Sequence, residues 1–77
     1  MDESILVTYM LRFAKREVSM NGKGRIFLPD FLEALPCDSK PSVEEMLRSW
    51  RKVYPKIPIR LATENVILID LGERARF

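Results

Sequence analysis

Along the first part of the chain, apolar residues recur at steps of three and four positions. Within residues 3–18 these apolar positions are Leu6, Val7, Met10, Leu11, Phe13, Ala14 and Val18, with polar residues between them. Such spacing places the apolar side chains on one face of a helix, so the pattern predicts a helix from Glu3 to about Val18. Ile5 and Tyr9 lie at the border of this face and make it broader than one small core requires.

A turn, a short strand and a short helix are predicted next. The segment MNGKG is expected to end the first helix, with Asn21 or Gly22 in the left-handed conformation that closes a helix C-terminus. RIFL, residues 25–28, is rich in strand-forming residues and predicts one short strand. Pro29 suits the first turn of a helix because it has no N–H to lose there. The helix predicted over PDFLEAL is expected to bury Phe31, Leu32 and Leu35.

The stretch PSVEEMLRSWRKVY carries a strong helical pattern. Ser42 and Glu45 have the spacing of a capping box, in which each side chain accepts a hydrogen bond from the other residue's backbone N–H. We therefore predict a helix over residues 42–54. Its apolar stripe consists of Val43, Met46, Leu47, Trp50, Val53 and Tyr54, and its opposite face carries Glu44, Arg48, Arg51 and Lys52. We expect Trp50 and Tyr54 to pack in the core, with Trp50 against Phe31 and the first helix.

The last part of the chain predicts a β-hairpin. IPIRLA and VILIDL are both rich in strand-forming residues, and Thr63, Glu64 and Asn65 join them as a tight turn. Since Pro58 cannot donate a ladder hydrogen bond, pairing is expected to begin at Ile59 or to lie on a sheet edge. The second strand is apolar on both faces, with Ile67, Ile69 and Leu71 on one face and Val66 and Leu68 on the other.

The order helix, strand, helix, helix, strand, strand describes an α+β fold in one domain, residues 1–77. This layout, with RIFLPDFLEALPCDSKPSVEEMLRSWRKVY at the strand and helix-turn-helix positions, resembles the winged helix-turn-helix superfamily. The resemblance implies that the short strand joins the hairpin in a three-stranded sheet. It also implies that the helix 42–54 is offered to the major groove of double-stranded DNA, as in a transcriptional regulator. Winged helices also serve as protein-binding modules, so an accessory subunit of a larger complex is the alternative function.

The cations of this layout are the candidate DNA-binding residues. They are Lys40, Arg48, Arg51, Lys52 and Arg60. Arginine can contact guanine through two hydrogen bonds in the major groove, and lysine can contact phosphate. The competing interpretation is a solvated helix face. Glu44 and Glu45 precede Arg48 by four and three positions, which favours weak surface pairs, and their charges near the helix N-terminus would repel phosphate.

Other polar residues have weaker functional interpretations. The hairpin tip is short and acidic at Glu64, so the hairpin is expected to complete the sheet rather than read DNA. Ser39 and Lys40 could bind phosphate at the helix N-terminus or form an ordinary polar turn. At the C-terminal end, phosphate contacts and a frayed tail are both open for Arg74 and Arg76. The loop cations Lys23 and Arg25 are expected only to aid solubility.

Composition narrows the function classes. The chain has 77 residues, is 47% hydrophobic, carries a formal net charge of +2, and contains one cysteine and no histidine. Without histidine there is no conventional zinc site and no histidine-based catalytic triad, so neither an enzyme nor a cofactor is expected. Cys37 cannot form an internal disulfide and is expected to be an ordinary thiol in a cytoplasmic protein. No apolar run is long enough to cross a membrane, and the acidic start of the chain does not resemble a secretory signal. Scarce side-chain amides and many charges suggest a thermophilic source.

Self-association is expected from the surplus apolar surface. Ile5 and Tyr9 on the first helix, together with Val66 and Leu68 on the last strand, exceed what so few elements can cover. We therefore expect a two-fold symmetric homodimer, through the first helix by preference and through the hairpin otherwise.

Overall fold

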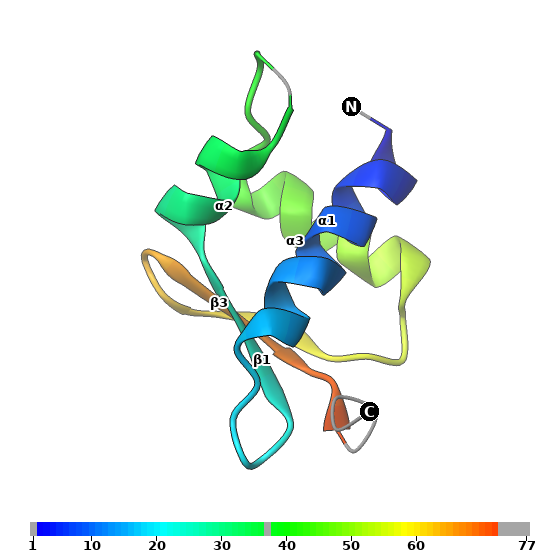
Figure 1. The fold of residues 1–77 in the computed structure, drawn as a ribbon. Coiled ribbons are helices and arrows are strands. Elements are labelled where there is room, and N and C mark those ends of the chain that lie inside the picture. Colours follow the sequence, from blue (N-terminus) through cyan, green and yellow to red (C-terminus); the bar gives the residue numbers. More distant parts are fainter. Residues whose placement is uncertain (1, 37, 73–77) are drawn as a thin grey trace.

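A computed structural model describes residues 2–36 and 38–72 and contains three helices and a three-stranded antiparallel sheet (Figure 1). The helices are α1 (Glu3–Arg16), α2 (Leu28–Ala34) and α3 (Val43–Val53), and the strands are β1 (Lys23–Phe27), β2 (Ile59–Thr63) and β3 (Val66–Asp70). The order α-β-α-α-β-β confirms the predicted α+β fold class, and the layout is compatible with a winged helix.

The strand order in the sheet is β1-β3-β2, so the last strand lies in the centre. Lys23 to Phe27 pair with Asp70 to Val66, and Ile59 pairs with Ile69 in the hairpin. Pairing in β2 therefore begins at Ile59, directly after Pro58, as predicted. The short strand β1 joins the hairpin through β3, which is the arrangement that the resemblance implied.

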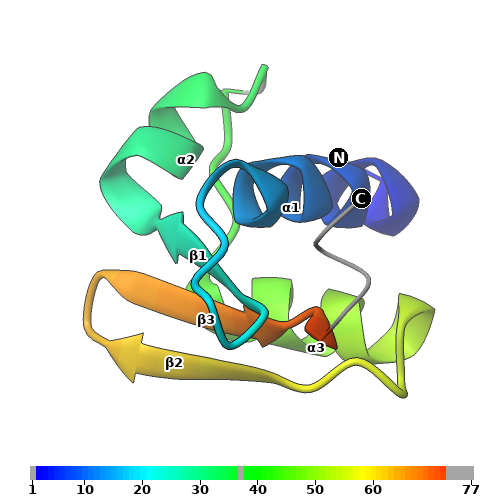
Figure 2. The same ribbon diagram turned by 60° about the horizontal axis from the view of Figure 1, so that its bottom comes forward.

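The core lies between the helices and one face of the sheet (Figure 2). Alternation along the strands directs Ile26, Ile67 and Ile69 inward, where each is fully buried. Trp50 is also fully buried, and its indole Nε1 donates a hydrogen bond to the carbonyl oxygen of Ile57 at 2.9 Å. The predicted burial of Trp50 is confirmed. The centroid of the Trp50 ring system lies 4.9 Å from that of Tyr54. The ring of Phe31 instead packs edge-on against Phe13, with 5.1 Å between the two ring centroids.

The end of α1 differs from the prediction. The helix ends at Arg16, and Val18 instead forms a bridge with Gly24. Two backbone hydrogen bonds flank this bridge, from Arg25 N to Glu17 O and from Ser19 N to Lys23 O, both at 3.0 Å. The chain therefore turns back on itself before β1. The two hydrogen bonds pair the Glu17 carbonyl and the Ser19 N–H, which one more helical turn would otherwise have to pair.

Gly22 belongs to this turn and not to the helix C-terminus. It has a φ of 77°, in the left-handed region, whereas Asn21 does not have a positive φ. The N–H of Gly22 donates to Ser19 O at 2.9 Å, which closes the turn. The prediction of a left-handed residue here was right in position and wrong in its role.

Two smaller predictions also change. Leu32 is only partly buried, while Phe31 and Leu35 are buried as expected. Thr63 belongs to β2 and pairs with Val66, so the hairpin turn consists of Glu64 and Asn65 alone. An irregularity between Leu61 and Thr63 shifts the register there.

Within the described residues, no helix is long and apolar enough to cross a membrane. The same residues contain no cluster of three or more acidic, cysteine or histidine side chains that could hold a metal ion.

Candidate functional site

Helix α3 is capped by a side chain at its N-terminus and buried along one side. The Ser42 hydroxyl accepts a hydrogen bond from the Glu45 backbone N–H at 3.1 Å, so the serine half of the predicted capping box is present. Met46, Ser49 and Trp50 are buried on the inner side. The helix also packs against α1 and β2. Its outer side therefore faces solvent.

The outer side of α3 carries three of the five candidate cations. Arg48, Arg51 and Lys52 are all exposed, as are Glu44 and Glu45 in the first turn. Among the described residues, neither arginine forms an ion pair, so the glutamates do not engage Arg48 as the helical spacing allowed. Lys52 lies 3.4 Å from the Glu3 carboxylate of α1, in a pair whose side chains are both well exposed.

Lys40 has a structural contact of its own. Its Nζ donates a hydrogen bond to the Leu35 carbonyl oxygen at 2.8 Å, and this bond is partly buried. Leu35 is the C-cap residue of α2, where carbonyls lack helical partners and a cation is favourable. The side chain of Lys40 thus serves the end of α2 in this structure. Cys37, Arg74 and Arg76 lie outside the described residues.

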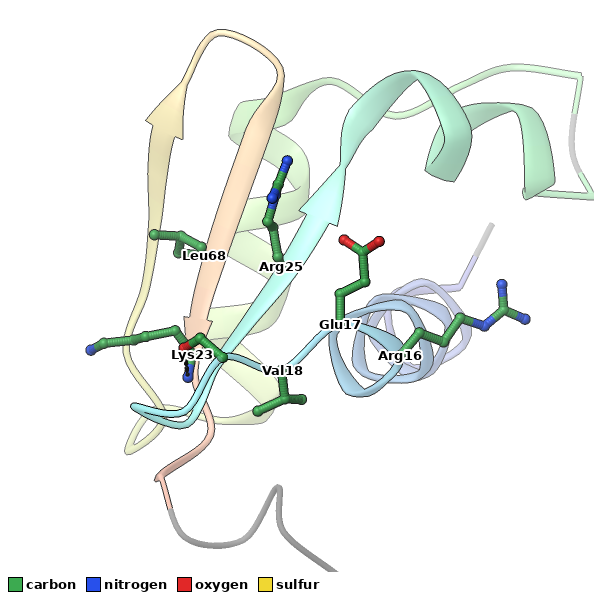
Figure 3. Close-up of a pocket in the computed structure, with 7 residues that line it drawn as sticks. Arg16, Glu17, Val18, Lys23, Arg25 and Leu68 are labelled. Atoms are coloured by element: carbon green, nitrogen blue, oxygen red, sulfur yellow. Dashed lines mark hydrogen bonds between the residues drawn. The ribbon is translucent and has the colours of Figure 1, made fainter.

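Arg60 lies on a different surface from the α3 cations. It pairs with Leu68 across β2 and β3, and its neighbour Ile59 points into the core. Arg60 therefore belongs to the outer face of the sheet. Figure 3 views this outer face, with Leu68 and Arg25 in front of the sheet and α3 behind it. The structure does not bring Arg60 together with the outer side of α3.

The outer face of the sheet holds a second group of charged residues, among them Lys23 and Arg25, which were expected only to aid solubility. An open groove of about 560 Å³ lies over β1 and the segment that follows α1. It is lined by Arg16, Glu17, Val18, Ser19, Lys23, Arg25 and Leu68 (Figure 3). The alternation in KGRIF, with Gly24 and Ile26 buried, was the signal that could have placed Lys23 and Arg25 on one face.

Charges on this outer face are only partly neutralised. The Lys23 Nζ lies 2.9 Å from the Asp70 carboxylate across β1 and β3. Hydrogen bonding to Lys23 lowers the pKa of Asp70 below its ordinary value, so this carboxylate is ionised and paired at neutral pH. Within the part of the chain that the structure describes, Arg25 and Arg60 form no ion pair. Among the described residues these two guanidinium groups therefore lie outside any ion pair, and Glu17 lines the groove that Arg25 also lines.

In comparisons with known proteins, no protein-family model, curated protein or solved structure matches this chain significantly.

Proposed function

We propose that this chain is a small winged-helix protein that binds double-stranded DNA and acts as a transcriptional regulator. The proposal rests on two exposed arginines, Arg48 and Arg51, on the solvent side of α3, whose inner side packs in the core. Among the described residues, neither arginine forms an ion pair. The order of elements and the sheet topology support it, because this layout presents the equivalent helix to a DNA groove in the superfamily that the sequence resembles.

The proposed contacts differ along α3. Arg48 lies nearer the start of the helix, where base edges are usually read, and would contact guanine through two hydrogen bonds. Arg51 and Lys52 lie in the last turn and would contact phosphates. Lys52 can exchange its carboxylate partner Glu3 for a phosphate at little cost, because an exposed ion pair contributes little free energy. Lys40 and Arg60 lie outside this contact.

A protein-interaction module is the second candidate function. The acidic residues Glu44 and Glu45 lie at the start of α3, and Glu64 is exposed in the hairpin turn. In a DNA complex these positions face a phosphate backbone, and their charges oppose it. The same acidic residues would suit contact with a basic surface of a larger protein.

The salt dependence of binding tests the DNA proposal. Each phosphate that is neutralised releases condensed counterions and adds about 0.9 to the slope of log affinity against log salt concentration. We expect the double variant Arg51→Ala/Lys52→Ala to weaken binding to all duplexes and to flatten the slope by up to about 2. Arg48→Ala is expected instead to relax sequence preference at one position, at a cost of about 1–3 kcal/mol. Fluorescence anisotropy with a mixed set of labelled duplexes measures both effects.

The acidic residues of α3 provide the control for this experiment. If Glu44 and Glu45 only support the helix, Glu44→Gln/Glu45→Gln changes affinity modestly and does not create binding. A wild-type protein without DNA affinity at low salt, combined with binding by this glutamine variant, would contradict the proposal. That outcome would favour the protein-interaction module.

We also propose a two-fold symmetric homodimer through α1. Ile5 is 48% exposed there, and Tyr9 and Arg12 line a shallow hollow beside it. The first turn of α1 is acidic and its last turn is basic, so an antiparallel pair of α1 helices would bring opposite charges together. Analytical ultracentrifugation at micromolar concentration is expected to show about twice the 9.0 kDa mass of one chain. Ile5→Asp should return the protein to one chain, and a wild type that sediments only as a monomer would refute the dimer.

A further inference from the structure

The outer face of the sheet combines an apolar centre with two cations in a single row. Arg25 and Arg60 are the cross-strand partners of Leu68, one on each side of β3. Neighbouring strands are about 4.8 Å apart, so the Cα atoms of the two arginines are separated by about 10 Å, with Leu68 between them. The row crosses all three strands, and no helix among the described residues covers it (Figure 3).

The residues around this row favour an apolar contact over an isolated anion. Phe27 is 40% exposed and pairs with the partly buried Val66, which extends the apolar surface along the strands. In the opposite direction along the strands, the next outward-facing pair is Lys23 and Asp70, which form an ion pair and together add no net charge. The wall formed by Glu17 and Val18 makes the groove partly apolar and partly acidic.

We propose that this outer face binds an acidic amphipathic helix of a partner protein. Arginine recognises carboxylates by two parallel hydrogen bonds, and within the described residues neither Arg25 nor Arg60 forms an ion pair. In a helix that crosses the strands, residues i and i+7 lie on one face and about 10 Å apart, which matches the spacing of Arg25 and Arg60. An apolar residue at i+4 then lies over Leu68.

A nucleic acid fits this face less well. A phosphate chain is charged at every step, so beyond the arginines it would also meet the Glu17 carboxylate, whereas a helix can place an apolar residue there. Beside Leu68 and Val66 the face exposes one aromatic ring, Phe27, which cannot stack a run of successive bases. A helix with both acidic and apolar residues uses the cations and the apolar centre together.

The probe for this site is a fluorescein-labelled helical peptide with glutamates at i and i+7 and leucine at i+4. We expect anisotropy to show saturable binding by the wild type. Arg25→Glu/Arg60→Glu is expected to weaken this binding at least about tenfold, since each charge-assisted carboxylate contact is replaced by repulsion. The milder Arg25→Gln/Arg60→Gln should weaken it less, and Leu68→Ser should weaken it while leaving the salt dependence intact.

Two controls separate this site from general electrostatics and from the DNA proposal. Lys15→Glu/Lys56→Glu makes the same change in net charge at exposed positions outside the groove, and should leave peptide affinity unchanged. Arg48→Ala/Arg51→Ala should also leave it unchanged, whatever their effect on DNA. Circular dichroism and the emission of buried Trp50 show whether each variant is folded.

Several results would overturn the proposal. They are no saturable binding of the peptide to the wild type, equal loss of binding in the Lys15/Lys56 control, and unchanged binding in both folded Arg25/Arg60 variants. Tighter binding of oligothymidylate than of peptide, lost in the Arg25/Arg60 variants, would assign the face to single-stranded nucleic acid. Loss of the dimer in those variants would assign it to a second copy of this chain.

Discussion

Replacing Trp50 with alanine is expected to lower the free energy of unfolding by about 3–5 kcal/mol, which is a large part of the stability of so small a domain. The indole is fully buried and packs on the Tyr54 ring at 4.9 Å. Its loss leaves a cavity between α3 and the rest of the core. It also leaves the Ile57 carbonyl without the hydrogen bond that Nε1 donates at 2.9 Å. Urea denaturation followed by far-ultraviolet circular dichroism measures the change.

Trp50→Phe separates the two contributions. Phenylalanine fills most of the space and removes the N–H, so this variant is expected to lose only about 1–3 kcal/mol. Before any substitution, the wild-type emission spectrum should be that of a tryptophan shielded from water. A water-like spectrum, or a loss below about 1 kcal/mol in Trp50→Ala, would contradict the burial of this side chain.

Local signals were sufficient to predict the existence and order of the elements. The stripe of apolar residues in α3 and its Ser42 cap fix a helix whose buried side is set by residue spacing alone. Pro29 and Pro58 marked a helix start and a strand start correctly, because the missing N–H restricts where proline can lie. These are constraints that act within a few residues, so they are visible in the sequence.

The end of α1 could not be predicted in the same way. Val18 continues the apolar spacing of the helix and is compatible with one more turn. In the structure it pairs with Gly24, and its neighbours bond to β1. The choice between helix and bridge depends on β1 being held in the sheet by β3, which is distant in sequence.

The grouping of charges depended even more on distant contacts. Hairpin register decides that Arg60 shares a row with Leu68 and Arg25, and not a surface with α3. The bond from Lys40 to Leu35 likewise depends on how the turn after α2 folds back. The sequence named Arg48, Arg51, Lys52 and Arg60 as candidate contacts, whereas their division between two faces needed the structure.

Gly22 connects the turn after α1 to the end of the sheet. Its carbonyl oxygen accepts hydrogen bonds from the N–H groups of Leu71 at 2.9 Å and Gly72 at 3.1 Å. It is also buried and has a φ of 77°. A Cβ at this position would lie 2.6 Å from the Gly72 carbonyl oxygen, which belongs to the backbone and cannot rotate away.

We therefore expect Gly22→Ala to lower the free energy of unfolding by about 2–4 kcal/mol, from an unfavourable φ together with a backbone clash. Gly72→Ala is the matched control, because Gly72 also has a positive φ, of 61°, but a Cβ there has nothing within 4 Å. This control is expected to lose only about 1–2 kcal/mol, the cost of the left-handed conformation itself. Urea denaturation of both variants gives the difference. Equal losses would show that the turn and the end of β3 do not approach as closely as the structure has them, since only the clash distinguishes the two sites.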